Sequence, residues 1–269
     1  MLDFFSLTLS FIRRNLKNPL YVIRYAYAFF QKDFENHASF LTNEELIQEL
    51  ENGKSLLRYG DGEIYMMNYG SIPQYEPYNK DLRRHLFEIV KNYKPSSPYI
   101  VGVPIFVNTP NHELRKDGKI KNGKLNVWLP LKVLYHFTFP HNVKYFDAHL
   151  FYREGGFERS LDLVLKKYKV IIVTRLFNIN LMKEAGIEGK FDVSFLITPE
   201  RESFKKVDEI FKELQNRVGN DKDKYRIILA TGPASKVLVY KLSNIGIVSY
   251  DIGRGIEAVY RRNEIEHFI

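Results

Sequence analysis

From about residue 140 onward, short apolar runs and longer amphipathic stretches alternate along the chain. The apolar runs predict strands, and the stretches with an apolar residue every three or four positions predict helices. The expected strands are residues 143–151, 169–173, 191–197, 225–230 and 245–250, and the expected helices are residues 158–168, 181–185, 200–218 and 234–244. Such alternation is typical of βαβ units, so we expect an α/β fold with a Rossmann-like, open, largely parallel sheet and helices on both faces.

The part of the chain before residue 140 adds two strands and several helices to this prediction. The strands are residues 55–57 and 99–103, and the helices are residues 43–52, 81–93 and 125–139. Residues 64–69 either enter a helix or pack beneath the preceding turn, and residues 107–124, which lack periodicity, predict a loop. Because no repeat or linker interrupts the pattern, we expect one α/β domain over residues 39–269.

Residues 1–38 differ from the rest and predict an amphipathic helical extension. Apolar and aromatic residues alternate there with arginine and lysine, and Asn18-Pro19 predicts a break between two helices. Residues 1–33 either rest on an anionic membrane surface or pack on the body or on a second copy of the chain, and we favour packing. The first 12 residues are too short to span a bilayer, and no signal-cleavage pattern follows them.

The amino-acid composition excludes some kinds of chemistry and favours some kinds of binding partner. The 269 residues include no cysteine, which excludes disulfides, thiolate zinc sites and a cysteine nucleophile. The formal net charge of +8 favours anionic ligands, but the basic residues are spread along the chain and form no nucleic-acid-binding motif. We therefore expect no nucleic-acid partner and a cytoplasmic location, either free or at the inner face of the membrane.

The segment Arg58-Tyr59-Gly60-Asp61-Gly62-Glu63 follows the first predicted strand and is the strongest candidate for chemistry. Gly60 and Gly62 allow a sharp turn at φ values closed to most residues. In an extended or turning backbone, side chains two apart can point the same way, so Asp61 and Glu63 can share one Mg²⁺ or Mn²⁺ bound to a diphosphate. Arg58 would orient these carboxylates or a phosphate. The alternatives are a polar turn and a strand-end salt bridge.

A second polar turn, Thr231-Gly232-Pro233-Ala234-Ser235-Lys236, connects a predicted strand to a helix. Gly232 permits close backbone approach, Pro233 suits a helix start, and free N–H groups there form an anion site. Ser235 and Lys236 would add a hydroxyl and a positive charge. The turn therefore predicts phosphate binding, with an ordinary strand-to-helix turn as the alternative.

A third polar turn begins at Asp251, where the last predicted strand ends, and continues through Ile252-Gly253-Arg254-Gly255. In open α/β sheets, ligands bind outside the carboxyl ends of the strands. If the three turns share that edge, metal, phosphate and sugar or nucleoside groups would converge there. The carboxylate of Asp251 or of Glu257 would offer a general base at this edge.

These motifs resemble those of bacterial glycosyltransferases with the GT-D fold, a family once known only as a domain of unknown function. The resemblance rests on Leu57-Arg58-Tyr59-Gly60-Asp61-Gly62-Glu63, on Gly232-Pro233-Ala234-Ser235-Lys236 and on Asp251-Ile252-Gly253, and it extends over about residues 40–260. The chain departs from the family pattern in residues 254–257 and 173–178, where donor and acceptor would be gripped.

The resemblance implies a metal-dependent transfer of a sugar, typically glucose from UDP-glucose, to a glycan acceptor on a surface glycoprotein or polysaccharide. Asp61 and Glu63 would hold the Mn²⁺ or Mg²⁺ that neutralises the departing diphosphate. Two alternatives stay open. One is a non-catalytic nucleotide- or glycan-binding subunit of a glycan assembly complex, and the other is a nucleotidyl- or phosphotransferase.

Overall fold

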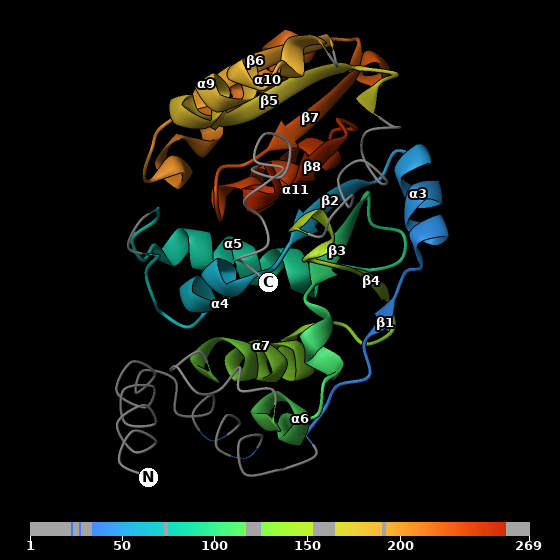
Figure 1. Ribbon diagram of the computed structural model, residues 1–269, viewed down its shortest axis with the longest axis vertical. Helices are drawn as coiled ribbons and strands as arrows, with labels where there is room; N and C mark the ends of the chain where they lie inside the picture. The colour runs from blue at the N-terminus through green and yellow to red at the C-terminus, as the bar shows by residue number, and fades with distance from the viewer. Residues whose placement is uncertain are drawn as a thin grey trace.

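All strand pairings in the computed structural model are parallel, and they join eight strands into one sheet of order β1-β4-β3-β2-β8-β7-β5-β6 (Figure 1). The structure describes residues 34–72, 75–116, 125–152, 165–189 and 192–256, together with residues 23 and 27. The strands are β1 (Ser39–Phe40), β2 (Ser55–Arg58), β3 (Tyr99–Val103), β4 (Lys144–Asp147), β5 (Lys169–Arg175), β6 (Asp192–Thr198), β7 (Tyr225–Leu229) and β8 (Ser249–Asp251). The expected α/β fold with a parallel sheet is confirmed.

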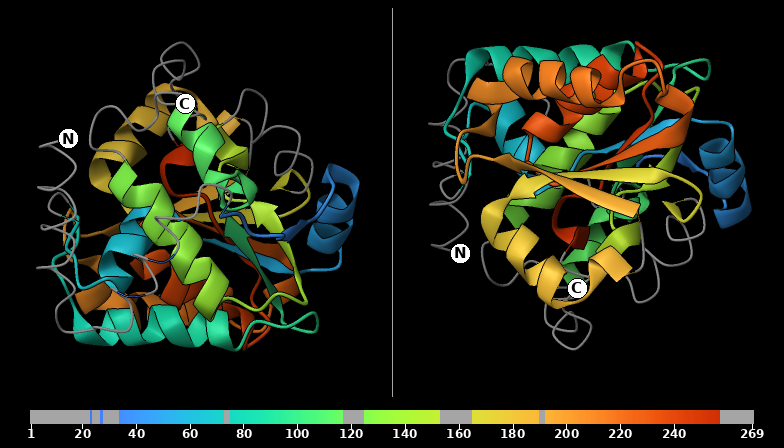
Figure 2. Two further views of the ribbon diagram at one scale, coloured as in Figure 1. Left: turned by 90° about the horizontal axis from the view of Figure 1, so that it is seen from below. Right: turned by 90° about the horizontal axis from the view of Figure 1, so that it is seen from above.

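Helices cover both faces of this sheet, as its crossover connections require. The α-helices are α3 (Asn43–Glu51), α4 (Asp61–Met67), α5 (Lys80–Lys91), α6 (Asn111–Lys116), α7 (Leu125–Thr138), α9 (Leu176–Glu184), α10 (Val207–Val218) and α11 (Ala234–Ser243). Figure 2 shows α5, α10 and α11 on one face, with α7 and α9 on the other. Short 3₁₀ turns η1 (Ile105–Asn108), η2 (Leu150–Tyr152), η4 (Ile187–Gly189), η5 (Ser203–Lys206), η6 (Lys222–Lys224) and η7 (Gly253–Gly255) complete the described elements.

The central strands β2, β3, β7 and β8 are buried because helices cover them from both sides, and β3 and β7 are mostly apolar. Leu56 and Leu57 of β2 have no exposed surface, and Val101 of β3 and Leu229 of β7 are equally buried. Such continuous apolar runs are typical of parallel strands. Helix α3 begins as predicted, since the Thr42 hydroxyl accepts from the Glu45 N–H while the Glu45 carboxylate accepts from the Thr42 N–H.

Several predicted boundaries were wrong. The stretch 107–124, predicted as a loop, contains the end of η1 and helix α6 within its described residues. Strand β4 ends at Asp147, because the Asp147 carboxylate accepts from the His149 N–H and turns the chain there. The predicted helix 200–218 is divided, since Glu202 adopts a left-handed φ of 58° before η5 and α10 begins only at Val207.

Two predictions fall largely outside the described residues. The helix expected at 158–168 is described only from residue 165, and the extension 1–38 only from residue 34 apart from residues 23 and 27. The division into an extension and one domain therefore stays a prediction. In the described part of the chain, no helix combines the length and apolar character needed to cross a bilayer.

Strands β3 and β4 approach each other closely at Gly102, which lies in register with Phe146. A Cβ atom added at Gly102 would stand 2.6 Å from the Phe146 ring. We expect Gly102→Ala to lower the free energy of unfolding by about 1–3 kcal/mol, the range for overpacking a core. Urea denaturation measures this effect, with Gly189→Ala as the matched control because a Cβ there meets no atom of the described residues within 4 Å. Equal stability of the two variants would contradict the prediction.

Candidate active site

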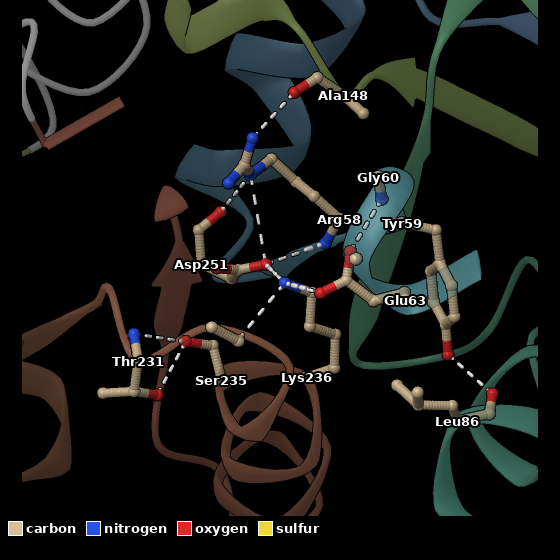
Figure 3. Close-up of polar contacts among 12 residues, drawn as sticks. Arg58, Tyr59, Gly60, Glu63, Leu86, Ala148, Thr231, Ser235, Lys236 and Asp251 are labelled. Carbon is tan, nitrogen blue, oxygen red and sulfur yellow. Dashed lines mark hydrogen bonds and ion pairs between the residues drawn. The ribbon is translucent and has the colours of Figure 1, made fainter. Parts of the chain in front are cut away.

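The three polar turns predicted from the sequence meet at one edge of the sheet. They follow β2, β8 and β7, which are neighbours in the strand order and run parallel, so their carboxyl ends lie together. Four charged side chains from these turns join in what we call the buried charge cluster: Arg58, Glu63, Lys236 and Asp251 (Figure 3). The cluster contains two cations and two carboxylates and is therefore balanced in charge.

Arg58, the last residue of β2, connects this cluster to two neighbouring strand ends. Its backbone N–H donates to Asp251 Oδ2 at 3.2 Å, and its Nε donates to the Asp251 carbonyl at 2.9 Å. Its Nη1 donates to the carbonyl of Ala148, just beyond β4, at 2.9 Å. The residue is 6% exposed. Arg58 thus connects the ends of β2 and β8 with the residue that follows β4. This arrangement corresponds to the strand-end salt bridge predicted from the sequence as the alternative role of Arg58.

Glu63 lies in the first turn of α4, and both of its carboxylate oxygens have partners. Oε2 accepts from the Gly60 N–H at 2.8 Å, and this contact caps the helix. Oε1 lies 2.7 Å from Lys236 Nζ. The residue is 5% exposed, so its carboxylate belongs to the interior of the edge rather than to its surface.

The glycines of this first turn have a role other than the predicted one. Gly60 has a φ of −110° and Gly62 is not among the described residues with positive φ, so neither requires a left-handed backbone. Gly62 is instead restricted by its neighbour, since an added Cβ would lie 2.9 Å from Ile72 Cδ1. The turn is sharp because a helix starts there directly after a strand.

Asp61 and Glu63 do not point the same way. Both lie in α4, where residues two apart lie on different sides of the helix, so the argument from an extended backbone was wrong. Asp61 is exposed, and its Oδ1 accepts from the Gly62 N–H at 2.8 Å. Among the residues that the structure describes, no group of three or more histidine, cysteine, aspartate or glutamate side chains is placed to hold a metal ion.

Lys236, in the first turn of α11, occupies the centre of the buried charge cluster. Its Nζ lies 2.7 Å from Glu63 Oε1 and 3.0 Å from Asp251 Oδ2, and it donates to the Gly232 carbonyl at 3.4 Å. Burial alone would lower the pKa of this lysine, but the charges of Asp251 and Glu63 outweigh burial and raise it above its ordinary value. Lys236 is therefore a permanent cation at this edge.

The turn before α11 has the predicted conformation. Gly232 has a φ of 62°, which only glycine adopts easily, and Pro233 precedes the first helical residue. Ser235 is fully buried, and its hydroxyl binds the N–H and the hydroxyl of Thr231 at 2.9 and 2.8 Å. Of the residues predicted to bind phosphate here, Ser235 and Lys236 are thus already engaged within the protein, while Gly232 remains partly exposed.

Asp251 has no exposed surface, and its Oδ1 has no hydrogen-bond partner among the described residues. Its other oxygen binds Lys236 and Arg58, so the carboxylate is a charge partner inside the edge. Glu257, the other predicted base, lies outside the described residues. Sequence reasoning did not find the Ala148 carbonyl that binds Arg58, because a backbone acceptor carries no residue-type signal.

Comparison with known proteins places the chain in a family. The family model described as Glycosyltransferase GT-D fold matches residues 56–263, which include all three polar turns. The chain belongs to this GT-D family. The expected resemblance is confirmed, and the GT-D assignment makes the chain a glycosyltransferase by family.

Solved structures show the same GT-D fold. A glycosyltransferase (DUF1792) from Streptococcus sanguinis superposes with a TM-score of 0.66 at 22% identity, covering 84% of both chains. The structure reported as the highly conserved domain of unknown function 1792, with a distinct glycosyltransferase fold, superposes at 0.65 and 22% identity, covering 85% of this chain and 82% of that chain.

A curated relative, the "Probable glycosyl transferase Gly" of Streptococcus gordonii, is 25% identical over 210 residues. The match covers 76% of this chain but only 30% of the length of that relative. This GT-D chain therefore corresponds to one segment of that longer relative.

Proposed function

We propose that this chain transfers a sugar, expected to be glucose, from a UDP-sugar to a glycan acceptor in the synthesis of a surface glycoprotein or polysaccharide. The observation that carries the proposal is the meeting of three polar turns at the carboxyl ends of β2, β8 and β7. In open parallel sheets this edge binds nucleotide ligands. The GT-D family supports a sugar donor and an acceptor, while the identities of both are our proposal.

A divalent metal, Mn²⁺ or Mg²⁺, fits this site through Asp61. That carboxylate is exposed at the start of α4, and such metals are commonly held by one or two carboxylates plus substrate phosphates. When bound, the metal would neutralise charge that develops on the leaving diphosphate. Glu63, the other predicted ligand, would have to release Lys236 before it could join Asp61.

The remaining residues of the edge position the donor. Gly232, two residues before the first residue of α11, offers its backbone to a phosphate at the positive end of the helix. Arg58 and Lys236 lie beneath the surface and hold the strand ends and the start of α11 in place, while Asp251 and Glu63 balance their charges. If transfer inverts configuration, we propose Glu257 as general base before Asp251, because Asp251 is buried and bound to two cations.

The alternative is a nucleotide- or glycan-binding subunit without catalysis. The engagement of Ser235 and Lys236 inside the protein favours it, since these side chains do not reach toward a ligand. UDP binding without turnover of any donor and acceptor pair would select this alternative. Contact of residues 1–33 with a membrane or a second copy, and a cytoplasmic location, stay predictions.

We expect Asp61→Ala to lower metal-dependent UDP release from the preferred UDP-sugar at least tenfold. The physical reason is the loss of the exposed carboxylate that would hold the metal against the diphosphate. The measurement is UDP release from a panel of UDP-sugars with Mn²⁺ or with EDTA. Asp192→Ala is the matched control, because Asp192 is also exposed but lies at the opposite end of its strand, at the start of β6.

Three results of this experiment differ in meaning. Hydrolysis of one donor by the wild type, lost in Asp61→Ala and kept in Asp192→Ala, would support the proposal and identify the sugar. Release of pyrophosphate or monophosphate instead of UDP would indicate a nucleotidyl- or phosphotransferase. Failure of UDP to bind at all with Mn²⁺ present would refute the UDP-sugar donor.

A further inference from the structure

Both oxygens of the Glu63 carboxylate already have a partner inside the protein in this arrangement. Oε1 contacts Lys236 Nζ at 2.7 Å, and Oε2 accepts from the Gly60 N–H at 2.8 Å. The first contact has the length of a charge-assisted hydrogen bond, and the second closes the cap of α4. A metal ion bound by Glu63 would therefore compete with the Lys236 ammonium at Oε1 or with the helix cap at Oε2.

The ammonium of Lys236 stands where a cation shared by the two buried carboxylates would stand. Glu63 Oε1 and Asp251 Oδ2 lie 2.7 and 3.0 Å from Nζ, and the Gly232 carbonyl lies 3.4 Å from it. A divalent ion at this point would need oxygen contacts of about 2.0–2.1 Å for Mg²⁺. The ion and the ammonium cannot share that volume. Lys236 is 3% exposed, so its side chain is enclosed by the protein.

Asp61 differs from Glu63 because its carboxylate lies at the surface of the protein. It is exposed, and its Oδ1 accepts from the Gly62 N–H next to it in sequence. A metal that also binds the phosphates of a nucleotide needs only one or two protein carboxylates. Asp61 can supply one without disturbing the ion pairs of the buried charge cluster.

We propose that Lys236 is the built-in cation of this edge, so that Asp61 alone supplies the protein carboxylate for a metal–nucleotide complex and Glu63 stays outside the metal's coordination. Glu63 is then a positioning residue that holds Lys236 and the start of α4. This inference rests on the proposed function for its nucleotide, but the lysine itself can be tested without one.

The second carboxylate oxygen of Asp251, Oδ1, leads to a testable consequence of the proposal. Oδ1 of this fully buried residue has no hydrogen-bond partner within the described part of the chain, while Oδ2 contacts Lys236. Removal of the ammonium would leave the two buried carboxylates of Glu63 and Asp251 with Arg58 as the one remaining cation of the cluster. Buried carboxylates in that state recruit a cation because unpaired burial of charge is costly. Lys236→Met, which keeps most of the volume, should therefore create a metal site.

The test is Mn²⁺ binding to the full chain, measured by electron paramagnetic resonance with Mn²⁺ alone and with Mn²⁺ plus UDP. We expect Lys236→Met to bind Mn²⁺ alone at least tenfold more tightly than the wild type, and the double variant with Glu63→Gln to lose this gain. With UDP, we expect Asp61→Asn to weaken Mn²⁺ binding at least tenfold and Glu63→Gln to change it less than threefold.

Two results would overturn the inference. One is an equal loss of Mn²⁺–UDP binding in Glu63→Gln and Asp61→Asn, and the other is a folded Lys236→Met variant without any gain for Mn²⁺ alone. If Lys236→Met does not fold, as judged by circular dichroism, the comparison of the two acid variants decides. If the wild type binds neither UDP nor Mn²⁺–UDP, the proposed donor fails, while the measurement with Mn²⁺ alone still decides the role of Lys236.

Discussion

Replacing Asp251 with alanine is expected to lower the free energy of unfolding by about 3–5 kcal/mol, the range for breaking a buried ion pair. Asp251 is fully buried, and its Oδ2 contacts Lys236 Nζ at 3.0 Å and the Arg58 N–H at 3.2 Å. Without it, the buried charge cluster would contain two cations and one carboxylate. Chemical denaturation measures the loss, and Asp223→Ala on the exposed turn η6 is the matched control.

A double-mutant cycle separates this charge effect from simple loss of packing. Lys236→Met and Asp251→Asn should each destabilise the protein, and the double variant should be less destabilised than the sum by about 1–3 kcal/mol, because the two groups are in contact. Additive effects within about 0.5 kcal/mol would contradict the pairing. The cycle also measures stability alone, so a catalytic role of Asp251 does not affect it.

The second large effect concerns pH and Glu76, in the segment between α4 and α5. Its side chain is 3% exposed, and burial raises its pKa from 4.5 to about 7, although the Phe204 N–H that donates to Oε2 at 3.3 Å acts in the opposite direction. Nearby Glu202 also raises this pKa, and Lys205 lowers it. Between pH 4.5 and about pH 7, the folded protein thus holds a proton on Glu76 that the unfolded chain releases.

The sign of the pH dependence follows from this retained proton. Because the pKa is higher in the folded state, Glu76 contributes stability that is fully present below pH 4.5 and is lost as the pH rises to about 7. Glu76→Gln keeps the neutral form at every pH. We expect the variant to gain about 2 kcal/mol relative to the wild type between pH 5 and pH 8.

Urea denaturation at both pH values tests this expectation. Glu184→Gln, on the exposed surface of α9, is the control and should show no such gain. If the difference between Glu76→Gln and the wild type were the same at pH 5 and pH 8, Glu76 would not retain its proton in the folded protein.

Hydrophobic periodicity predicted an element well where the sequence defined both whether it is a helix or a strand and where it begins and ends. Strand β3 was predicted with its observed ends, because the run from Tyr99 to Val103 is apolar and Pro104 ends it. Helix α9 begins five residues before its predicted start, at Leu176. The side chain of its N-cap, Arg175, makes no capping hydrogen bond, so no capping residue marked the beginning.

The meeting of the three polar turns at one edge was predicted from the sequence, but the ion pairs among their side chains were not. The turns after β2, β7 and β8 were expected at one edge because each follows a strand of a parallel sheet and because ligands bind at the carboxyl ends of such strands. The direction of Glu63 could also have been predicted, since a glutamate three residues after an N-cap commonly folds back onto the cap. The ion pairs of Lys236 could not have been predicted, because Glu63 and Lys236 are distant in sequence and become neighbours only when β2, β8 and β7 pair in the observed order.

The position of β8 has a consequence for how the chain reaches this structure. It is the last strand in sequence, yet it lies between β2 and β7 and is the strand through which β1-β4-β3-β2 and β7-β5-β6 are joined. During synthesis, β2 and β7 therefore each lack one strand neighbour until residues 249–251 have emerged. The contact of Arg58 with Asp251, 193 positions apart, then forms as β8 joins them. Completion of the sheet and assembly of the site are therefore one event, and a nascent chain lacking its last strand has neither.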